Sequence, residues 1–204
     1  ATGAAGTNGT NGSDGAAGAD GADGASILTE LTDVITTGEG SILIGGASSS
    51  ASYNTAFGYN SLDATSSQKN SAFGYNSLTN STSGASNSAF GQDSGKNIST
   101  GSYNTAIGQK SSVDLSSGDY NVSLGFNAGD NITSNSNNTF IGSNTLGSNT
   151  TNATVLGYGV TSQGSNTVTL GNSDVTDVYL AQDSGATVHV NQLNLDGTSV
   201  TATA

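Results

Sequence analysis

A five-residue pattern of polar, small and large apolar positions recurs along the chain from residue 41 to residue 171. Most copies begin with a polar residue, continue with a small or β-branched residue, a middle residue and a large apolar residue, and end with glycine. The copies at 54, 70, 104 and 121 read NTAFG, NSAFG, NTAIG and NVSLG. Alternate residues of a strand share a face, so the large apolar residue lies on the same face as the residue two positions earlier. The pattern predicts a series of very short strands, each closed by a glycine.

The closing glycines follow one another at intervals of 13, 16, 17, 17, 17, 17, 15 and 14 residues. This period is too short for a propeller blade or a pair of helices, and it fits one coil of a β-solenoid. We expect each glycine to turn the chain at a corner, and the large apolar residues to stack into one ridge inside the solenoid. The predicted structural residues are Gly58, Gly74, Gly91, Gly108, Gly125, Gly142, Phe57, Phe73, Phe90, Ile107, Leu124 and Ile141.

One large apolar side chain per coil is too little to hold the coil in place. Ordering the backbone costs about 1–2 kcal/mol per residue, whereas burying one Phe or Leu returns only about 1.5–3 kcal/mol. Backbone ladders supply part of the difference, and stacked Asn side chains add hydrogen bonds of their own. We expect burial against other copies of the chain to supply the rest.

Residues 1–26 follow a second period, with glycine at every third position from residue 3 to residue 24. Three polyproline-type chains wound around one axis require such a triplet, because only glycine fits at the centre. The segment is predicted to be a collagen-like, triple-helical Gly-X-Y stalk, with a flexible Gly-Ala-Asp linker as the alternative. The stalk and the thin core both indicate a homotrimer.

The solenoid is predicted to cover residues 41–174, between two shorter segments. Residues 27–40 form a junction, because their apolar spacing suits a short coiled coil and their composition equally suits strands. Residues 175–204 hold two alternating runs around the sequence QDSG, and we expect them to form capping strands rather than a linker to another domain. The first residue is Ala, so we expect the chain to be a piece of a longer protein.

Composition narrows the classes of function. Fifteen acidic residues against three lysines give a net charge of -12, which repels nucleic acid and anionic membrane surfaces. The longest apolar runs are far shorter than a bilayer-spanning helix, so no membrane insertion is expected. The absence of cysteine removes disulfides and thiolate metal sites.

No group of residues predicts catalysis, and we expect the protein not to be an enzyme and to hold no cofactor or metal. The single histidine, His189, stands in an alternating run typical of a packed imidazole. A capsule depolymerase remains an alternative, because paired carboxylates assemble in space rather than in sequence. The candidate carboxylates are Asp63, Asp93, Asp114, Asp119 and Asp130.

Aromatic residues directly after the closing glycines are candidates for contact with glycans. Tyrosine offers an apolar ring and a polar tip, which together suit a sugar. The alternative is that these rings cover the corners of the solenoid or the seams of a trimer. The candidates are Tyr59, Tyr75, Phe126 and Tyr158.

The repeats resemble those of the YadA-like head of trimeric autotransporter adhesins. NTAFG, NTAIG and NVSLG are similar to its Asn-Ser-x-Ala-Ile-Gly motif, although most copies here place Asn four rather than five residues before the glycine. That resemblance covers residues 41–174 and implies a left-handed parallel β-roll packed as a homotrimer. The longer phrase SYNTAFGYNSL and the closing NTVTLGNSDVTDVYLAQDSGATVHV resemble phage tail-fibre and related virion-fibre proteins.

The expected function is that of a structural fibre on a virion, such as a phage tail or head fibre. It would contact other virion proteins at one end and a host cell-surface receptor, a glycan among the candidates, at the other. The head of a bacterial adhesin, located on the cell surface, is the alternative. An ice-binding solenoid is disfavoured, because the column that would need a regular Thr array is mixed, with Ile42, Val122 and Val168 among its members.

Overall fold

The computed structural model describes residues 34–35, 40–45, 51–63, 66–179, 193–195 and 198–200. Ten short strands form one sheet in which strand order follows the sequence. The strands are β1 (Val34–Ile35), β2 (Ile42–Ile44), β3 (Thr55–Phe57), β4 (Ser71–Phe73), β5 (Ser88–Phe90), β6 (Thr105–Ile107), β7 (Val122–Leu124), β8 (Thr139–Ile141), β9 (Thr154–Leu156) and β10 (Val168–Leu170).

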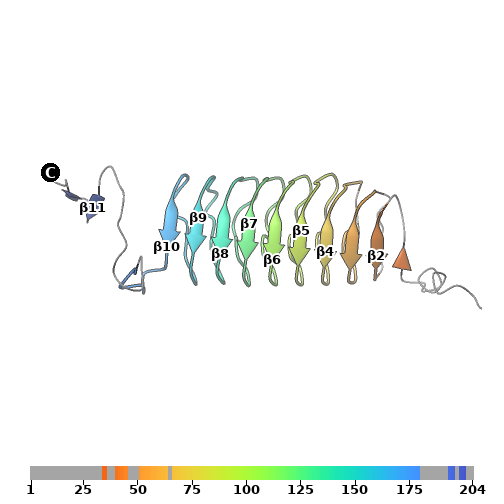
Figure 1. Ribbon diagram of the computed structural model, residues 1–204, viewed down its shortest axis with the longest axis horizontal. Helices are drawn as coiled ribbons and strands as arrows, with labels where there is room; N and C mark the ends of the chain where they lie inside the picture. Colours follow the sequence, from red (N-terminus) through yellow and green to blue (C-terminus); the bar gives the residue numbers. More distant parts are fainter. Residues whose placement is uncertain are drawn as a thin grey trace, which may run out of the picture.

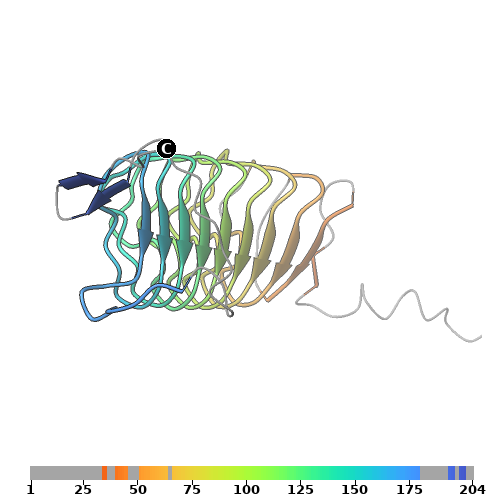
Figure 2. The ribbon, with the colours of Figure 1, turned by 60° about the vertical axis from the view of Figure 1, so that its left-hand side comes forward.

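Strands β2 to β10 are all parallel, and each pairs with the next one along the chain. They lie side by side along the long axis (Figure 1), and after each strand the chain returns behind the sheet (Figure 2). Equivalent positions of the repeat are direct partners, as Phe57, Phe73 and Phe90 are. The prediction of an all-β parallel solenoid is confirmed.

The predicted inner ridge is wrong, because the large apolar residues face outward. In β3, Ala56 is 1% exposed and Phe57 is 57% exposed, and the same alternation recurs in β6 and β9. The pattern of alternation is as predicted, but the inner face is the face of the middle residue. The inward column is Leu43, Ala56, Ala72, Ala89, Ala106, Ser123, Phe140 and Val155.

The large strand residues face outward because residues after the corner already fill the interior of the coil from the side opposite the strand. Leu78 in one coil and Ile98 in the next are fully buried. The two residues come from different positions of the repeat. One coil has the large Leu78 at the first position and the small Ser81 at the second, and the next coil has the small Gly95 at the first position and the large Ile98 at the second. A Cβ on Gly95 would stand only 3.0 Å from the side chains of both Leu78 and Ile98. In these coils the large residues leave room for little more than a methyl group from the strand, and the inward residues there are Ala72 and Ala89.

A ladder of buried asparagines runs through the stack, as the sequence indicated. Oδ1 of each one accepts the backbone N–H of the residue one coil later, from Asn54 to Asn70 at 2.9 Å and onward to Asn138 and Ala153 at 3.0 Å. Side-chain Nδ2 groups donate to carbonyls across the coil, as Asn87 does to Gly101 at 2.8 Å. The ladder therefore satisfies the buried polar groups of successive coils.

The closing glycines occupy the predicted corners. Gly91 has a φ of +133°, and a Cβ there would lie 2.7 Å from the carbonyl group of Gly108 in the next coil. Both the backbone angle and the close approach of the coils require glycine.

The segments on either side of the solenoid are described in part. The predicted stalk, residues 1–26, lies outside the described residues, as does the QDSG turn. In the junction, β1 pairs antiparallel with β2. Residues 175–179 belong to no strand, and a hairpin forms further on, between β11 (Leu193–Leu195) and β12 (Thr198–Val200), which pair with each other and not with β10.

Candidate binding surface

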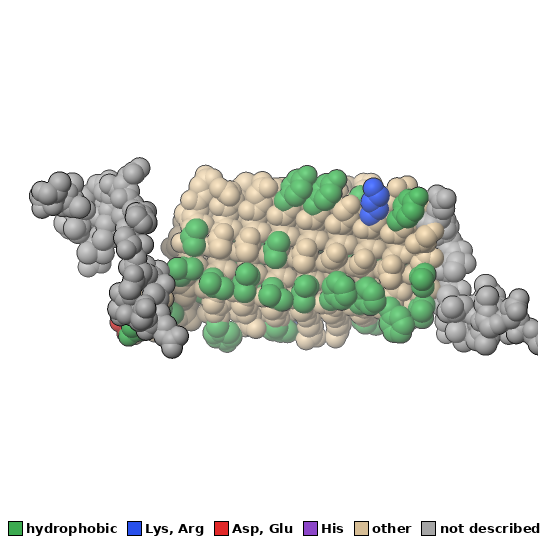
Figure 3. Space-filling view, viewed as in Figure 1, with side chains coloured by type: hydrophobic (Ala, Val, Ile, Leu, Met, Phe, Trp, Pro, Cys, Tyr) green, Lys and Arg blue, Asp and Glu red, His purple; other side chains and the backbone are tan. Residues whose placement is uncertain are grey.

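One row of apolar side chains follows the outer face of the sheet. It consists of the third residue of each strand from β3 to β10, and Figure 3 shows hydrophobic side chains gathered along this line from one end of the stack to the other. Phe73 is partly buried, the other members are between 37% (Ile141) and 57% (Phe57) exposed, and the rings of Phe73 and Phe90 stack at 4.8 Å. The outer row is defined as Phe57, Phe73, Phe90, Ile107, Leu124, Ile141, Leu156 and Leu170.

The structure brings two of the four predicted glycan contacts together. Tyr59 and Tyr75 stack with their centroids 5.7 Å apart, beyond the carboxyl ends of β3 and β4. Phe126 and Tyr158 belong to the same column, but Gln92, Gln109 and Ser143 occupy the coils between. All four side chains are about half exposed or more.

A second tyrosine pair lies at the other end of the strands. Tyr103 and Tyr120 stand two residues before β6 and β7, their ring centroids are 4.9 Å apart, and the rings are parallel to within 1°. Both are more than half exposed. Their regular position before the strand was visible in the sequence, but the in-register stacking follows only from the parallel pairing of β6 with β7.

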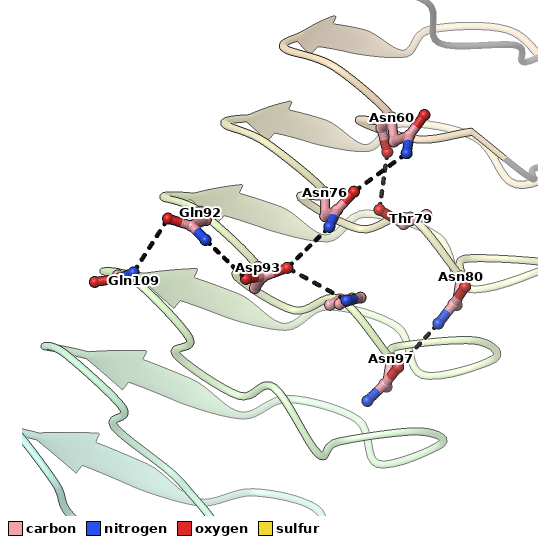
Figure 4. A network of polar contacts seen from close by, with 9 residues as sticks. Asn60, Asn76, Thr79, Asn80, Gln92, Asp93, Asn97 and Gln109 are labelled. Atoms are coloured by element: carbon pink, nitrogen blue, oxygen red, sulfur yellow. Dashed lines mark hydrogen bonds and ion pairs between the residues drawn. The ribbon is translucent and has the colours of Figure 1, made fainter.

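A polar ladder follows the corner next to Tyr59 and Tyr75 (Figure 4). Asn60 Nδ2 donates to Asn76 Oδ1 at 3.3 Å, and Asn76 Nδ2 donates to Asp93 Oδ1 at 3.1 Å. Lys96 Nζ lies 3.4 Å from the same Asp93 oxygen. Burial acts to raise the pKa of Asp93, but the hydrogen bonds from Asn76 and Lys96 and the charge of Lys96 outweigh it, so the pKa lies below its ordinary value.

Two of the candidate carboxylates meet, one coil apart. A side-chain hydrogen bond with Asp130 raises the pKa of Asp114, and burial and the charge of Asp130 raise it further, against a smaller opposing effect of the Asn131 backbone. The two carboxyl groups repel each other when both are ionised, which disfavours the charged form of Asp114.

The remaining candidates are separated or lie outside the described residues. Asp119 Oδ1 accepts the backbone N–H of Ser102 at 2.7 Å, a contact that joins two successive coils. His189 falls in the part that is not described. Across the described ranges, no cluster of three or more His, Cys, Asp or Glu side chains is placed to hold a metal ion, and no helix has the length and apolar character to cross a membrane.

An open pocket of about 460 Å³ marks the C-terminal end of the stack, lined in part by Val160, Thr161, Thr169 and Asn172. Thr169 continues the inward column into the last coil. Its Oγ1 is buried and has no hydrogen-bond partner among the residues that the structure describes. The pocket is thus the uncovered end of the solenoid interior.

Comparison with known proteins gives no relative: no family model, no curated protein and no solved structure matches this chain.

Proposed function

We propose that three copies of this chain form a fibre on a virion, a phage tail or head fibre, that projects from the particle and attaches to the host cell surface. The observation that carries the proposal is the outer row. Soluble monomers seldom expose an apolar patch that runs the length of the molecule, and such patches typically mark interfaces.

A second copy of the same chain is the partner that suits this row. Its members recur once per coil, so an identical solenoid presents side chains at the same rise, and contacts repeat along the whole length. No charged residue belongs to the outer row. Three copies arranged around one axis close the interface without leaving an edge, which satisfies the symmetry of homo-oligomers.

The glycine triplets of residues 1–26 support the same number of chains, because a collagen-like stalk needs three. A left-handed roll, as in the YadA-like heads, is the handedness we propose for the coils. A rigid stack on a thin stalk has the shape of a spacer that carries a contact surface away from a particle. Host attachment then falls to the exposed faces that the outer row does not use.

The proposal is tested by electron microscopy of the purified chain and by adsorption to candidate host cells. We expect uniform rods of threefold mass that bind cells and compete with virion adsorption. Single thin solenoids, or rods that neither bind cells nor compete, would contradict it.

A further inference from the structure

The Tyr103–Tyr120 stack ends abruptly on both sides. The column that contains it reads Lys69, Ser86, Tyr103, Tyr120 and Asn137, one residue per coil, all with φ between +58° and +64°. The backbone N–H of each of the last four bonds to a carbonyl of the preceding coil, so the column is regular. Stacking covers one face of each ring, and the outer faces meet Ser86 on one side and Asn137 on the other.

In the coil after Tyr120, a space the height of one aromatic ring therefore remains next to the tyrosine, above Asn137. We call this space the step. The two tyrosine rings, one coil apart, are 4.9 Å from centroid to centroid. At the next level the regular backbone carries the short, exposed side chain of Asn137 instead of a third ring. A flat six-membered ring placed there would stack on Tyr120 as Tyr103 does from the other side.

Polar groups around this step are unused. Neither phenol hydroxyl has a hydrogen-bond partner within the described ranges, and the Asn137 side-chain amide, which offers two donors and an acceptor, has none there either. The step thus combines one aromatic face with donors and acceptors at its rim. The three residues of the column that form it, Tyr103, Tyr120 and Asn137, are uncharged.

We propose that the step formed by Tyr120 and Asn137 binds a pyranose ring of a host-surface saccharide. The C–H groups on one face of the sugar carry a slight positive charge and lie against the negative face of the tyrosine ring, while its hydroxyls reach the amide and phenol groups. A protein partner would need a wider apolar surface than one ring, and an anionic membrane is repelled by the net charge of -12.

This site rests on the proposed attachment function but uses a different surface. Tyr103 and Tyr120 precede their strands, whereas the outer row lies at the carboxyl ends of the same strands. Packing three chains along the outer row leaves the tyrosine corner at the opposite end of each strand. A trimer would then present three copies of the step, one from each chain, which raises avidity for a polymer of sugars.

The experiment is binding of the full chain to a printed array of neutral, N-acetylated and uronic-acid oligosaccharides. The best-bound oligosaccharide is then titrated in solution by tyrosine emission, because the chain has no tryptophan. Three variants are compared with the parent: Tyr120→Ala removes the platform, Asn137→Tyr fills the step with a third ring, and Tyr179→Ala removes an exposed, unstacked tyrosine as control. Circular dichroism and mass establish that each variant keeps its fold and assembly.

We expect the parent to bind, Tyr120→Ala and Asn137→Tyr each to raise the Kd tenfold or more, and Tyr179→Ala to stay within twofold. Asn137→Tyr is the sharper test, since Tyr103 and Tyr120 show that this backbone position accepts the side chain. Absence of binding on the whole array, or parent-like affinity of Asn137→Tyr, overturns the proposal. Trimeric rods that adsorb to cells without binding the array would overturn the saccharide step alone, whereas a monomer that binds through the step would overturn only the fibre.

Discussion

Asn104 and Asn121 are joined through the interior of two successive coils. Asn104 Oδ1 accepts the backbone N–H of Asn121 at 2.9 Å and its side-chain Nδ2 at 3.1 Å, while Asn104 Nδ2 donates to the Gly118 carbonyl at 2.8 Å. Both residues are buried. One side chain therefore connects its own coil to the next and also crosses its own interior.

Replacing Asn104 with Ala should lower the free energy of unfolding by about 2–4 kcal/mol, because buried partners at Asn121 and Gly118 lose their hydrogen bonds. Urea denaturation measures the change. Asn80→Ala is the matched control, since its amide bonds to Asn97 at the surface, at 2.9 Å, and its loss should cost less than about 1 kcal/mol. Equal costs for the two variants would show that the interior ladder is not a principal source of stability.

Gly91→Ala should be among the most damaging single-methyl changes in the solenoid. The new Cβ would meet the Gly108 carbonyl at 2.7 Å with a φ of +133°, so the coil must shift as well as strain, at a cost of about 2–4 kcal/mol. Gly159→Ala is the control, because φ is +62° and nothing lies within 4 Å. We expect thermal unfolding to separate the two clearly, and a Gly91→Ala midpoint no lower than that of Gly159→Ala would refute the close-stacking account.

Ala106 and Ile107 test which face of the strand is inside. Ala106 is 1% exposed and Ile107 is 39% exposed, so Ala106→Leu overpacks the coil at a cost of about 1–3 kcal/mol. Ile107→Leu keeps its volume on the outer row and should unfold at nearly the parent's denaturant midpoint. If Ile107→Leu were less stable than Ala106→Leu, the large residues of the outer row would instead lie in the interior.

The repeat, its period and its parallel stacking were predictable because identical side chains in successive coils leave few other arrangements. Which face of each strand points into the solenoid was not predictable, because alternation defines two faces without saying which of them packs against Leu78 or Ile98 across the coil. Aligning the complementary Leu78–Ser81 and Gly95–Ile98 pairs would have supplied that signal. The tyrosine step was hidden for a similar reason: Tyr103 and Tyr120 are 17 residues apart in sequence and become neighbours only through the register of β6 and β7.

Asp114 and Asp130 give the solenoid a pH-dependent weakness. The folded pKa of Asp114 is raised, first by its hydrogen bond with Asp130, so protonation of Asp114 stabilises the fold under acid and this contribution is lost as the pH rises through that pKa. Asp114→Asn should therefore increase the free energy of unfolding at neutral pH, with a difference that shrinks on acidification. Urea titrations across the acid range measure it.

Asp130→Asn should relieve the same repulsion at neutral pH, and the double variant should gain little beyond either single change, because the two groups form one coupled pair. Additive gains, or a benefit that grows as the pH falls, would contradict the repulsion between Asp114 and Asp130.

The central claim is that the outer row packs against further copies of the chain, and sedimentation equilibrium at micromolar concentration tests it most directly. The account predicts three times the mass of one chain for the parent, and a folded single chain for a variant carrying Phe90→Asp and Ile107→Asp, whose side chains point away from the core. A parent that sediments as a folded monomer, or a doubly charged variant that remains trimeric, would contradict it.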